Sequence, residues 1–328
     1  MIPPPARLGL PDLGVGVGLR VPHYRHVFGE RPAVDFFEVI SENFMVEGGR
    51  PIYHLERALE SYRVVQHGVA LGIGGPAELD RAYLERLKQL VRKTSTPWVS
   101  DHFCWSGAGG AHVHDLLPMP YTAEAVDRIV QRARMVQDFL EVPFALENTS
   151  SYLTYKSSVL SEWEFIAEIA DRADIGLLFD VNNVFVSAYN HGFDPVEFVE
   201  RVPHRRIVQI HLAGHTNLGS HIIDTHRGQV SDAVLDLYEL TIRRAGPIST
   251  LIEWDDEIPD FQTLWAEAER ARSVRERALS GRDGAELEQR LQAVRALARP
   301  QGDAASDEAH GWKQGGPREN AAGDDEAA

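Results

Sequence analysis

Cysteine is almost absent from this chain of 328 residues, in which Cys104 is the only one. A single thiol excludes an intramolecular disulfide, which fits a cytoplasmic protein. It also excludes an iron–sulfur cluster or a structural zinc site held by several cysteines. Long apolar runs are missing as well, since none approaches the roughly 18 residues of a membrane-spanning helix. We therefore expect no membrane partner, and the first residues lack the pattern of a signal peptide.

Basic residues are scarce, because 33 Lys and Arg face 49 Asp and Glu, which gives a net charge of −16. So acidic a chain is poorly suited to bind the phosphate backbone of a nucleic acid, and we expect no nucleic-acid partner. The content of 43% hydrophobic and 25% charged residues is typical of a globular enzyme. A chain of this length forms either two domains or one α/β barrel.

Eight short apolar runs of strand length alternate with amphipathic stretches of helical periodicity. The first two runs cover 13–19 and 34–40, and the other six end at His67, His102, Glu147, Asp180, His211 and Glu253. Helices are expected at 52–62, 78–93, 123–140, 162–172, 195–201, 233–244 and 261–272. The gap between the first two runs is short, so the first helix is expected to be reduced to one turn. Eight strands alternating with helices predict a (β/α)8 TIM barrel.

The composition changes after residue 273. We predict a metal-binding catalytic barrel domain at 1–273 and one more amphipathic helix within 274–300. Residues 301–328 contain seven acidic and two basic residues. Such a segment buries too little apolar surface to offset the entropy of the chain, so we predict a disordered acidic tail. The apolar positions of the extra helix are Leu287, Leu291, Val294 and Leu297.

Imidazole or carboxylate side chains stand at the ends of the last six apolar runs. A buried strand has no ordinary use for them, because an uncompensated charge in the interior is destabilising by several kcal/mol. In a TIM barrel the C-terminal ends of the strands form one rim, where the chemistry takes place. A lone residue of this kind is most often structural, but six at equivalent positions indicate a shared metal centre.

Further candidate donors lie just beyond these strands. Asn183 and His215 are expected in the following loops, while Asp224 and His226 occupy alternate positions, hence one side of an extended segment. Nitrogen and oxygen donors suit iron, manganese or zinc. About ten ligands exceed the needs of one octahedral ion, so we expect two or three metals bridged by carboxylates. The alternative for His215 is that it orients a ligand.

Two other residues lie at the same rim. Glu38 lies near the end of the second run, where it could be a ligand, a base or a substrate anchor, and we favour a contact to a ligand or to substrate. Cys104 lies two residues beyond His102, and packing is the more common use of a lone buried cysteine.

At these residues the sequence resembles the multinuclear non-heme iron-dependent oxidative enzymes, to which the methanobactin-biosynthesis oxidase is related. This group was formerly domain-of-unknown-function family 692 and uncharacterised protein family 0276. The similarity runs from about residue 8 to residue 272. The motifs that carry it are Ser41-Glu42-Asn43-Phe44, Val65-Gln66-His67-Gly68-Val69, Ser100-Asp101-His102, Leu146-Glu147-Asn148, Asp180-Val181-Asn182-Asn183-Val184, Ile210-His211-Leu212-Ala213-Gly214-His215, Ile223-Asp224-Thr225-His226 and Leu251-Ile252-Glu253-Trp254-Asp255.

The resemblance implies a xylose-isomerase-like TIM barrel that holds two or three iron ions (Fe2+/Fe3+) and uses O2 as co-substrate. It implies an oxidase that modifies residues, usually cysteines, of a ribosomally made precursor peptide, with a small partner protein that captures the precursor. Some relatives have histidine where this chain has Asn183, which leaves one metal position in question. Carried over by position, the iron ligands are His67, His102, Glu147, Asp180, Asn183, His211, Asp224, His226 and Glu253, with His215 in a matching motif.

Two alternatives stay open at this point. One is redox-neutral metal chemistry, as in the sugar isomerases and apurinic endonucleases that place similar ligands at the strand ends of the same kind of barrel. The acidic charge of the chain counts against a nuclease. The other is a metal-loaded binding or delivery subunit without turnover. Metal identity and substrate-dependent O2 uptake distinguish the three.

Overall fold

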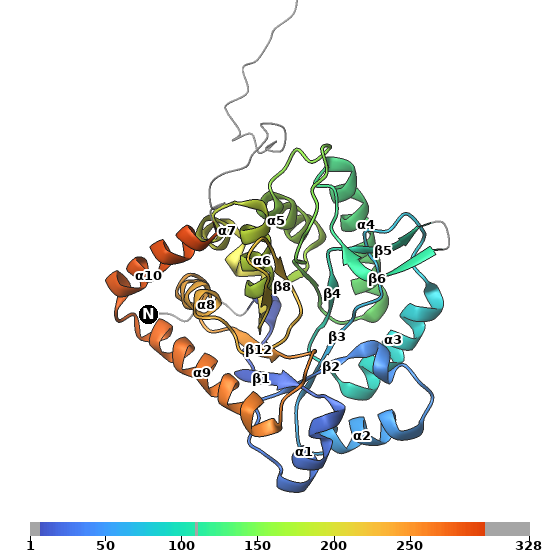
Figure 1. Cartoon of the computed structure of the whole chain (residues 1–328). Coiled ribbons are helices and arrows are strands. Elements are labelled where there is room, and N and C mark those ends of the chain that lie inside the picture. Colours follow the sequence, from blue (N-terminus) through green and yellow to red (C-terminus); the bar gives the residue numbers. More distant parts are fainter. Residues whose placement is uncertain (1–6, 109–110, 299–328) are drawn as a thin grey trace, which may run out of the picture.

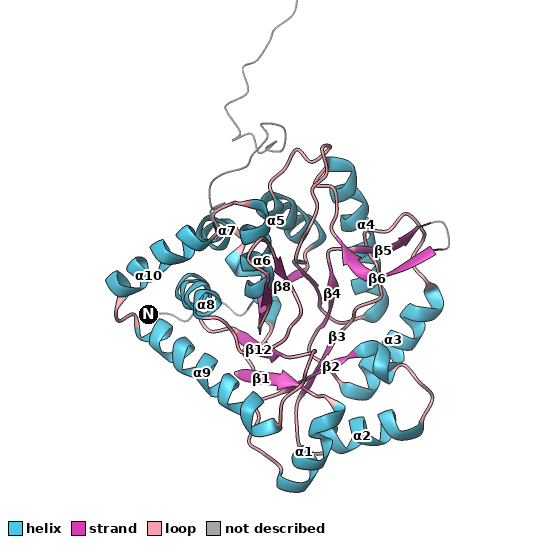
Figure 2. Cartoon of the chain, in the orientation of Figure 1, coloured by secondary structure: helices cyan, strands magenta, loops and turns pink. Residues whose placement is uncertain are grey.

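Eight parallel strands form a closed barrel in the computed structural model, which describes residues 7–108 and 111–298 (Figure 1). The strand order around the barrel is β1-β12-β9-β8-β7-β4-β3-β2. The predicted TIM barrel is therefore confirmed. Helices lie outside the strands, as Figure 2 shows. The barrel strands are β1 (Val15–Gly18), β2 (Phe37–Ile40), β3 (Val64–His67), β4 (Val99–His102), β7 (Phe144–Glu147), β8 (Gly176–Asp180), β9 (Ile207–Ala213) and β12 (Ser249–Glu253).

Most helices begin and end within three residues of the bounds expected from their apolar periodicity. An exception is α1, which has seven residues, nearly two turns instead of one. Among the described residues, no helix combines the length and apolar character that crossing a membrane requires. The helices are α1 (Tyr24–Glu30), α2 (Gly49–Leu59), α3 (Arg81–Thr94), α4 (Ala123–Leu140), α5 (Glu162–Ala173), α6 (Val181–His191), α7 (Pro195–Arg201), α8 (Asp232–Ala245), α9 (Phe261–Ser280) and α10 (Gly284–Leu297).

Helix α9 is longer than expected, since it continues past Arg272 to Ser280. Its buried face includes Val274 and Ala278, so the apolar stripe that packs on the protein extends further than the sequence pattern suggested. Residue 273, the expected end of the barrel domain, lies inside this helix. Helix α10 follows and packs against α7 and α8. It buries Leu287, Leu291 and Val294, whereas Leu297 is exposed. The expected tail at 301–328 lies outside the described residues.

The barrel interior contains an apolar layer and, toward the rim formed by the C-terminal ends of the strands, polar side chains. Leu13, Phe36, Val65, Trp98 and Leu251 form a separate buried cluster. From this cluster a chain of hydrogen bonds leads to a strand-end histidine. The Trp98 indole donates to Gln209 at 2.8 Å, the Gln209 amide donates to Glu38 at 2.5 Å, and Nε2 of His211 lies 3.1 Å from the same Glu38 oxygen. These hydrogen bonds pair polar atoms of Trp98, Gln209, Glu38 and His211 inside the barrel.

Three elements of the rim were not expected from the sequence. Helix α6 begins directly after β8, without a loop. Two antiparallel hairpins follow barrel strands: β5 (Trp105–Ala108) pairs with β6 (Ala111–Leu117) after β4, and β10 (Thr216–Asn217) pairs with β11 (Ile222–Ile223) after β9. The β10 and β11 segments are too short for period-two alternation to reveal them. These elements border the strand ends where the candidate site lies.

Candidate metal centre

The six strand-end residues meet at one rim of the barrel and are at most 7% exposed. Strand pairing places His102 beside Glu147 and Asp180 beside His211 on neighbouring strands. Because the strands are parallel, side chains at their C-terminal ends converge. His67, His102, Glu147, Asp180 and Glu253 are the last residues of β3, β4, β7, β8 and β12, and His211 lies two residues before the end of β9.

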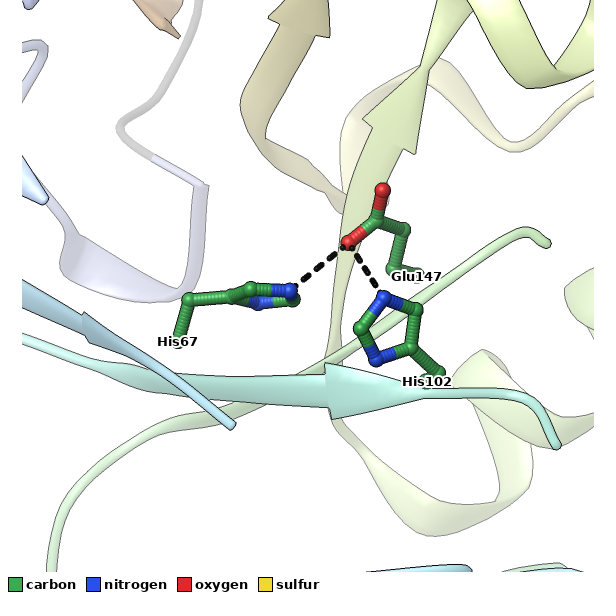
Figure 3. Close-up of side chains that lie close together, drawn as sticks. All are labelled: His67, His102 and Glu147. Carbon is green, nitrogen blue, oxygen red and sulfur yellow. Dashed lines mark ion pairs between the residues drawn. The ribbon is translucent and has the colours of Figure 1, made fainter. Parts of the chain in front are cut away.

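The first group of donors is formed by His67, His102 and Glu147. One carboxylate oxygen, Glu147 Oε2, lies 3.3 Å from Nε2 of His67 and 3.4 Å from Nε2 of His102 (Figure 3). Figure 3 shows this oxygen facing both imidazoles, which come from the adjacent strands β3 and β4. All three donor atoms lie within 4.8 Å of one another. Such spacing allows a single cation to contact all three.

The second group consists of Glu147, Asp180, His211 and Glu253, all buried. The other oxygen of Glu147, Oε1, lies 3.5 Å from Nδ1 of His211, and Glu253 Oε2 lies 3.0 Å from the same nitrogen. The third group contains His226, Glu253 and Asp255. There Nδ1 of His226 lies 3.3 Å from Glu253 Oε2 and 3.8 Å from Asp255 Oδ2.

Two carboxylates belong to more than one group. Glu147 is shared by the first and second groups, and Glu253 is shared by the second and third. A carboxylate between two cations offsets the repulsion between them, because it places negative charge on the line that separates them. The arrangement therefore suits the row of two or three bridged ions expected from the number of candidate ligands.

Hydrogen bonds fix which ring nitrogen faces the centre in two histidines. Nδ1 of His102 lies 3.1 Å from the carbonyl oxygen of Gly68, which can only accept, so Nδ1 carries a proton. The Ser100 hydroxyl donates to the Gln66 carbonyl at 3.3 Å and accepts from Nδ1 of His67 at 2.9 Å. In both rings Nε2 therefore faces Glu147. A ligand histidine whose other ring nitrogen is hydrogen-bonded in this way is typical of metal sites.

Glu38 is absent from all three groups, although it is only 1% exposed. Its carboxylate accepts hydrogen bonds from Gln209 and from Nε2–H of His211. This contact turns Nδ1 of His211 toward Glu147 and Glu253. Glu38 is thus hydrogen-bonded to a candidate ligand, and a contact between Glu38 and substrate stays a prediction. Burial raises its pKa, while His211 opposes the shift.

The charges of the centre shift several pKa values strongly. Burial lowers the pKa of His102, but Glu147 and Asp101 outweigh it and raise this pKa to about 9. Burial and the neighbouring His102 hold the pKa of His67 well below its usual value. Burial, reinforced by Glu147, raises the pKa of Asp180 well above its usual value. Protons here offset the negative charge of the clustered carboxylates, as bound cations do in metal sites.

The same balance holds on the other side of the centre. Burial works against protonation of His211 and His226, yet the carboxylates around them raise both pKa values well above the usual range. Burial would also raise the pKa of Glu253, but the two histidines reverse this and hold it well below its usual value. The centre is therefore a cluster of strongly coupled charges.

Several buried polar atoms in the centre make no hydrogen bond of suitable geometry with the described residues, even where a carboxylate lies close by. An unpaired buried polar atom costs free energy, so a set of them at one place calls for a bound group that would satisfy them. The donors are carboxylate, amide and imidazole atoms, which fit iron, manganese or zinc. The unpaired atoms are Glu147 Oε2, Asp180 Oδ2, Asn183 Oδ1, His211 Nδ1 and His226 Nε2.

The expected loop position of Asn183 is wrong, because this residue lies in the first turn of α6. Asp180 caps that helix, and its Oδ1 accepts the backbone N–H of Asn183 at 2.6 Å. A helix begins without a loop because the last strand residue is itself a good N-cap. Asp180 Oδ2 and Asn183 Oδ1 are left unpaired.

The segment after β11 brings Asp224 and His226 together, as their alternate positions predicted, with Asp224 Oδ1 3.0 Å from Nε2 of His226. His226 has a φ of 47°, a left-handed conformation that is strained for a residue other than glycine and is often found at functional sites. His215 is not in any of the three groups. Its Nδ1 lies 2.7 Å from Oδ1 of Asn182, and the alternative that His215 orients a ligand stays a prediction.

Sequence reasoning missed two polar residues of this region as site candidates. Asp255 belongs to the third group and is bound by Arg20 through Nε at 2.9 Å. Asn182 donates to Asp224 at 2.8 Å and contacts His215, so it links two candidate donors. Asp255 lies two residues after Glu253, and that spacing was an available signal, whereas Asn182 is placed only by the unexpected helix α6.

A family model described as "RiPP precursor modification enzyme MbnB/TglH/ChrH" matches residues 14–276, where RiPP denotes a ribosomally synthesised and post-translationally modified peptide. The chain is 49% identical to a UPF0276 protein of Anaeromyxobacter sp. (strain Fw109-5) over 268 residues, which are 82% of this chain and 95% of the relative. It is 48% identical to a UPF0276 protein of Caulobacter vibrioides (strain NA1000 / CB15N) over 272 residues, which are 83% and 96%.

Solved structures with a similar fold are much more distant in sequence. A xylose isomerase-like TIM barrel/4-hydroxyphenylpyruvate dioxygenase fusion protein has a TM-score of 0.56 at 13% identity, over 85% of this chain and 44% of its own. The D-allulose 3-epimerase of Methylomonas sp. has a TM-score of 0.53 at 12% identity, over 84% of this chain and 99% of its own. At such identity the comparison establishes the xylose-isomerase-like barrel alone.

Proposed function

The chain belongs to the RiPP precursor modification enzyme family MbnB/TglH/ChrH, as its motifs predicted, and from this premise we propose that it is an iron-dependent, O2-using oxidase of a precursor peptide. The family makes the chain an enzyme that acts on such a peptide. The iron, the O2 and cysteine as the modified residue are our proposal. A small partner protein that presents the precursor is part of the same proposal.

The observation that carries the proposal is the pair of shared carboxylates. Glu147 and Glu253 each join two donor groups, so the row of groups suits two or three cations rather than one. Nitrogen and oxygen donors of this kind suit iron. Cys104, the only thiol, is in none of the groups found among the described residues. A thiolate from the substrate would therefore be the only sulfur ligand of the centre.

Iron held there would supply redox chemistry in which O2 takes up the electrons and protons that the peptide loses and leaves as water. The residues of the chain would hold the metal ions and orient their ligands. In the proposal His67, His102 and Glu147 bind at one position, and Glu147, Asp180, His211 and Glu253 bind at the next. Ser100, Gly68 and Glu38 fix the rings of the three histidines by accepting their remaining N–H groups.

The peptide would approach through an apolar pocket of about 350 Å³ at the same rim. Its walls come from the segments that directly follow β3, β4 and β7, the strands that end at the first donor group. Trp105, Met119, Pro120 and Tyr155 give the pocket an apolar lining, to which Ala125 of α4 also belongs. A pocket of this size accepts an aromatic or aliphatic side chain of a peptide.

The wall on the β3 side is held in place by a buried arginine. Arg132, only 7% exposed, donates to the carbonyl oxygens of Ile73 at 2.8 Å, Gly75 at 2.6 Å and Ala77 at 2.6 Å. The pocket is therefore formed before a peptide binds, which reduces the entropy lost on binding.

The test is co-expression of the chain with the short open reading frames beside its gene. The intact mass of each small product, with and without the chain, reveals a modified precursor. A loss of mass corresponding to oxidation, dependent on iron and accompanied by O2 uptake, is the expected result. Unchanged masses for every neighbouring product would contradict the peptide oxidase.

Metal content separates the two alternatives. Tightly bound zinc together with a modified peptide but without O2 uptake would indicate redox-neutral chemistry. Bound iron without any change in substrate, even in the presence of O2 and the partner protein, would indicate a metal-loaded binding subunit. The protein must be purified under anaerobic conditions with added Fe2+ before the results are interpreted. A protein without metal would show no turnover under any of the three hypotheses.

A further inference from the structure

Two carboxylates outside the donor groups hold residues 68–71, the short segment that follows β3. Glu42 approaches the segment from the 3-10 helix η3 (Ser41–Phe44), which follows β2, and Asp101 approaches it from β4. Since β2 and β4 flank β3 in the barrel, the segment is held from both sides. Successive residues of a strand point to opposite faces. Asp101 Oδ1 accordingly lies 3.9 Å from Nδ1 of His102, on the side of the ring away from the Nε2 that faces Glu147.

The backbone N–H groups of three consecutive residues donate hydrogen bonds to these two carboxylates. Glu42 Oε1 accepts from Val69 and Ala70, each at 2.9 Å, and also from the hydroxyl of Tyr83 at 2.6 Å. Asp101 Oδ2 accepts from Leu71 at 3.2 Å. Hydrogen bonds to a charged acceptor are stronger than those between neutral groups. The segment therefore has little freedom to move relative to β2 and β4.

Gly68, the first residue of the segment, fits closely against this arrangement. A Cβ atom at this position would lie 2.5 Å from Asp101 Oδ2 and 3.3 Å from the hydroxyl oxygen of Tyr83. The Gly68 N–H donates to the Ser100 carbonyl at 2.7 Å. Burial, together with Asp101 and Glu42, raises the pKa of Tyr83 well above its usual value, so its hydroxyl remains a donor.

The Gly68 carbonyl is the acceptor that holds Nδ1–H of His102 at 3.1 Å and leaves Nε2 toward Glu147. We propose that Glu42 is a positioning residue, which fixes the orientation of His102 at the metal centre through the backbone of residues 68–71. The inference rests on the proposed metal centre. It gives a role to the Ser41-Glu42-Asn43-Phe44 motif, none of whose residues belongs to a donor group.

The experiment compares Glu42→Ala and Glu42→Gln with a matched control, Glu164→Ala. Glu164 also accepts a backbone N–H, that of Ser161 at 2.9 Å, but it lies on helix α5 away from the three donor groups. Each metal-free protein is titrated anaerobically with Fe2+ alone against a competing chelator. The absorption spectrum of each Co2+-loaded protein reports the ligand geometry, and thermal unfolding of the metal-free proteins reports stability.

We expect Glu42→Ala to weaken the tightest Fe2+ site about 10- to 100-fold, the usual effect of removing a group that orients a ligand. Its Co2+ spectrum changes as well. Glu42→Gln should recover most of the affinity, because the amide oxygen still accepts from Val69 and Ala70, and it remains informative if the alanine variant does not fold. The control should match the wild type in affinity and spectrum.

The outcomes are distinguishable. If Glu42→Ala unfolds at a lower temperature but keeps wild-type affinity and spectrum, Glu42 is merely structural and the inference is overturned. The same follows if the glutamine and alanine variants are equally impaired. If the wild-type protein binds neither Fe2+ nor Co2+, the proposed metal centre fails, and the positioning role fails with it.

Discussion

At the scale of the residue, the position of a single carboxylate between two donor groups decides how many ions one substitution affects. The two oxygens of Glu147 face different partners, since Oε2 lies near His67 and His102 while Oε1 lies near His211. His67, in contrast, belongs to one group only. Removing either side chain therefore tests whether the groups are linked as the geometry suggests.

We predict that Glu147→Ala lowers bound metal by more than one equivalent, whereas His67→Ala lowers it by no more than one. The reason is that Glu147 contributes to two groups and His67 to one. Metal-to-protein ratios from inductively coupled plasma mass spectrometry after anaerobic reconstitution provide the measurement. Asp236→Ala, a substitution at a carboxylate on α8 that pairs with Arg290, is the control and should keep the full content. Retention of all metal by Glu147→Ala contradicts the bridging assignment.

At the scale of the element, helix α5 places two glutamates in its first turn with opposite titration behaviour. Glu162 is 8% exposed, and burial raises its pKa to about 7 although a hydrogen bond from Tyr121 opposes the shift. Glu164 is exposed, and the hydrogen bond that its carboxylate accepts from the backbone N–H of Ser161 lowers its pKa. It completes a capping box with Ser161, a motif that stabilises the start of a helix.

We predict that Glu162→Gln stabilises the protein above pH 7 and has little effect below pH 4.5. A raised folded-state pKa means that the folded protein loses stability as the pH rises from about 4.5 to about 7. At about 1.4 kcal/mol per pKa unit, the difference from the wild type reaches up to about 3 kcal/mol. Urea unfolding between pH 4 and pH 8 measures it. Equal stabilities at pH 8 would show that the Glu162 carboxylate is hydrated.

Glu164→Gln provides the opposite sign on the same helix. Its lowered pKa contributes stability above the pKa of the unfolded chain, and that stability is lost as the pH falls through the folded-state value. We predict that Glu164→Gln destabilises the protein at pH 7 and that the difference shrinks toward acid pH. The effect should be small, because Glu164 is solvated. A loss that grows at low pH would contradict the capping assignment.

At the scale of the whole molecule, the barrel and most of the candidate centre follow from one-dimensional patterns. The ends of the eight apolar runs lie within two residues of the ends of eight strands, and a parallel barrel brings such ends to one rim. The number of donors beyond a single octahedron predicted shared carboxylates, and Glu147 and Glu253 each belong to two of the groups of neighbouring side chains, while the binding of metal there stays a prediction. The prediction of the barrel succeeds because periodicity and burial act locally along the chain.

Features that depend on contacts between distant segments could not be predicted in this way. Asn183 was expected in a loop because nothing in its neighbours shows that Asp180 would serve at once as strand end and helix cap. The role of Glu38 depends on Gln209 and His211, which are 171 and 173 residues away in the sequence but next to it in space. The apolar pocket likewise depends on the segments that follow β3, β4 and β7, which have no common sequence signal.

The pocket permits a prediction that separates peptide recognition from metal chemistry. Ala125→Leu places a larger side chain in the lining of the pocket on α4, whereas Ala123→Leu makes the same change two residues away at an exposed position outside the lining. We predict that Ala125→Leu raises the KM for the co-expressed precursor at least tenfold and leaves the bound metal unchanged, because the peptide side chain loses its place while the ligands keep theirs. Ala123→Leu should behave as the wild type in steady-state assays and in metal content. If both variants turn over the precursor with wild-type KM, the peptide binds elsewhere on the rim, and the exposed side chains of Tyr152 and Leu153 in the loop after β7 become the surface to substitute next.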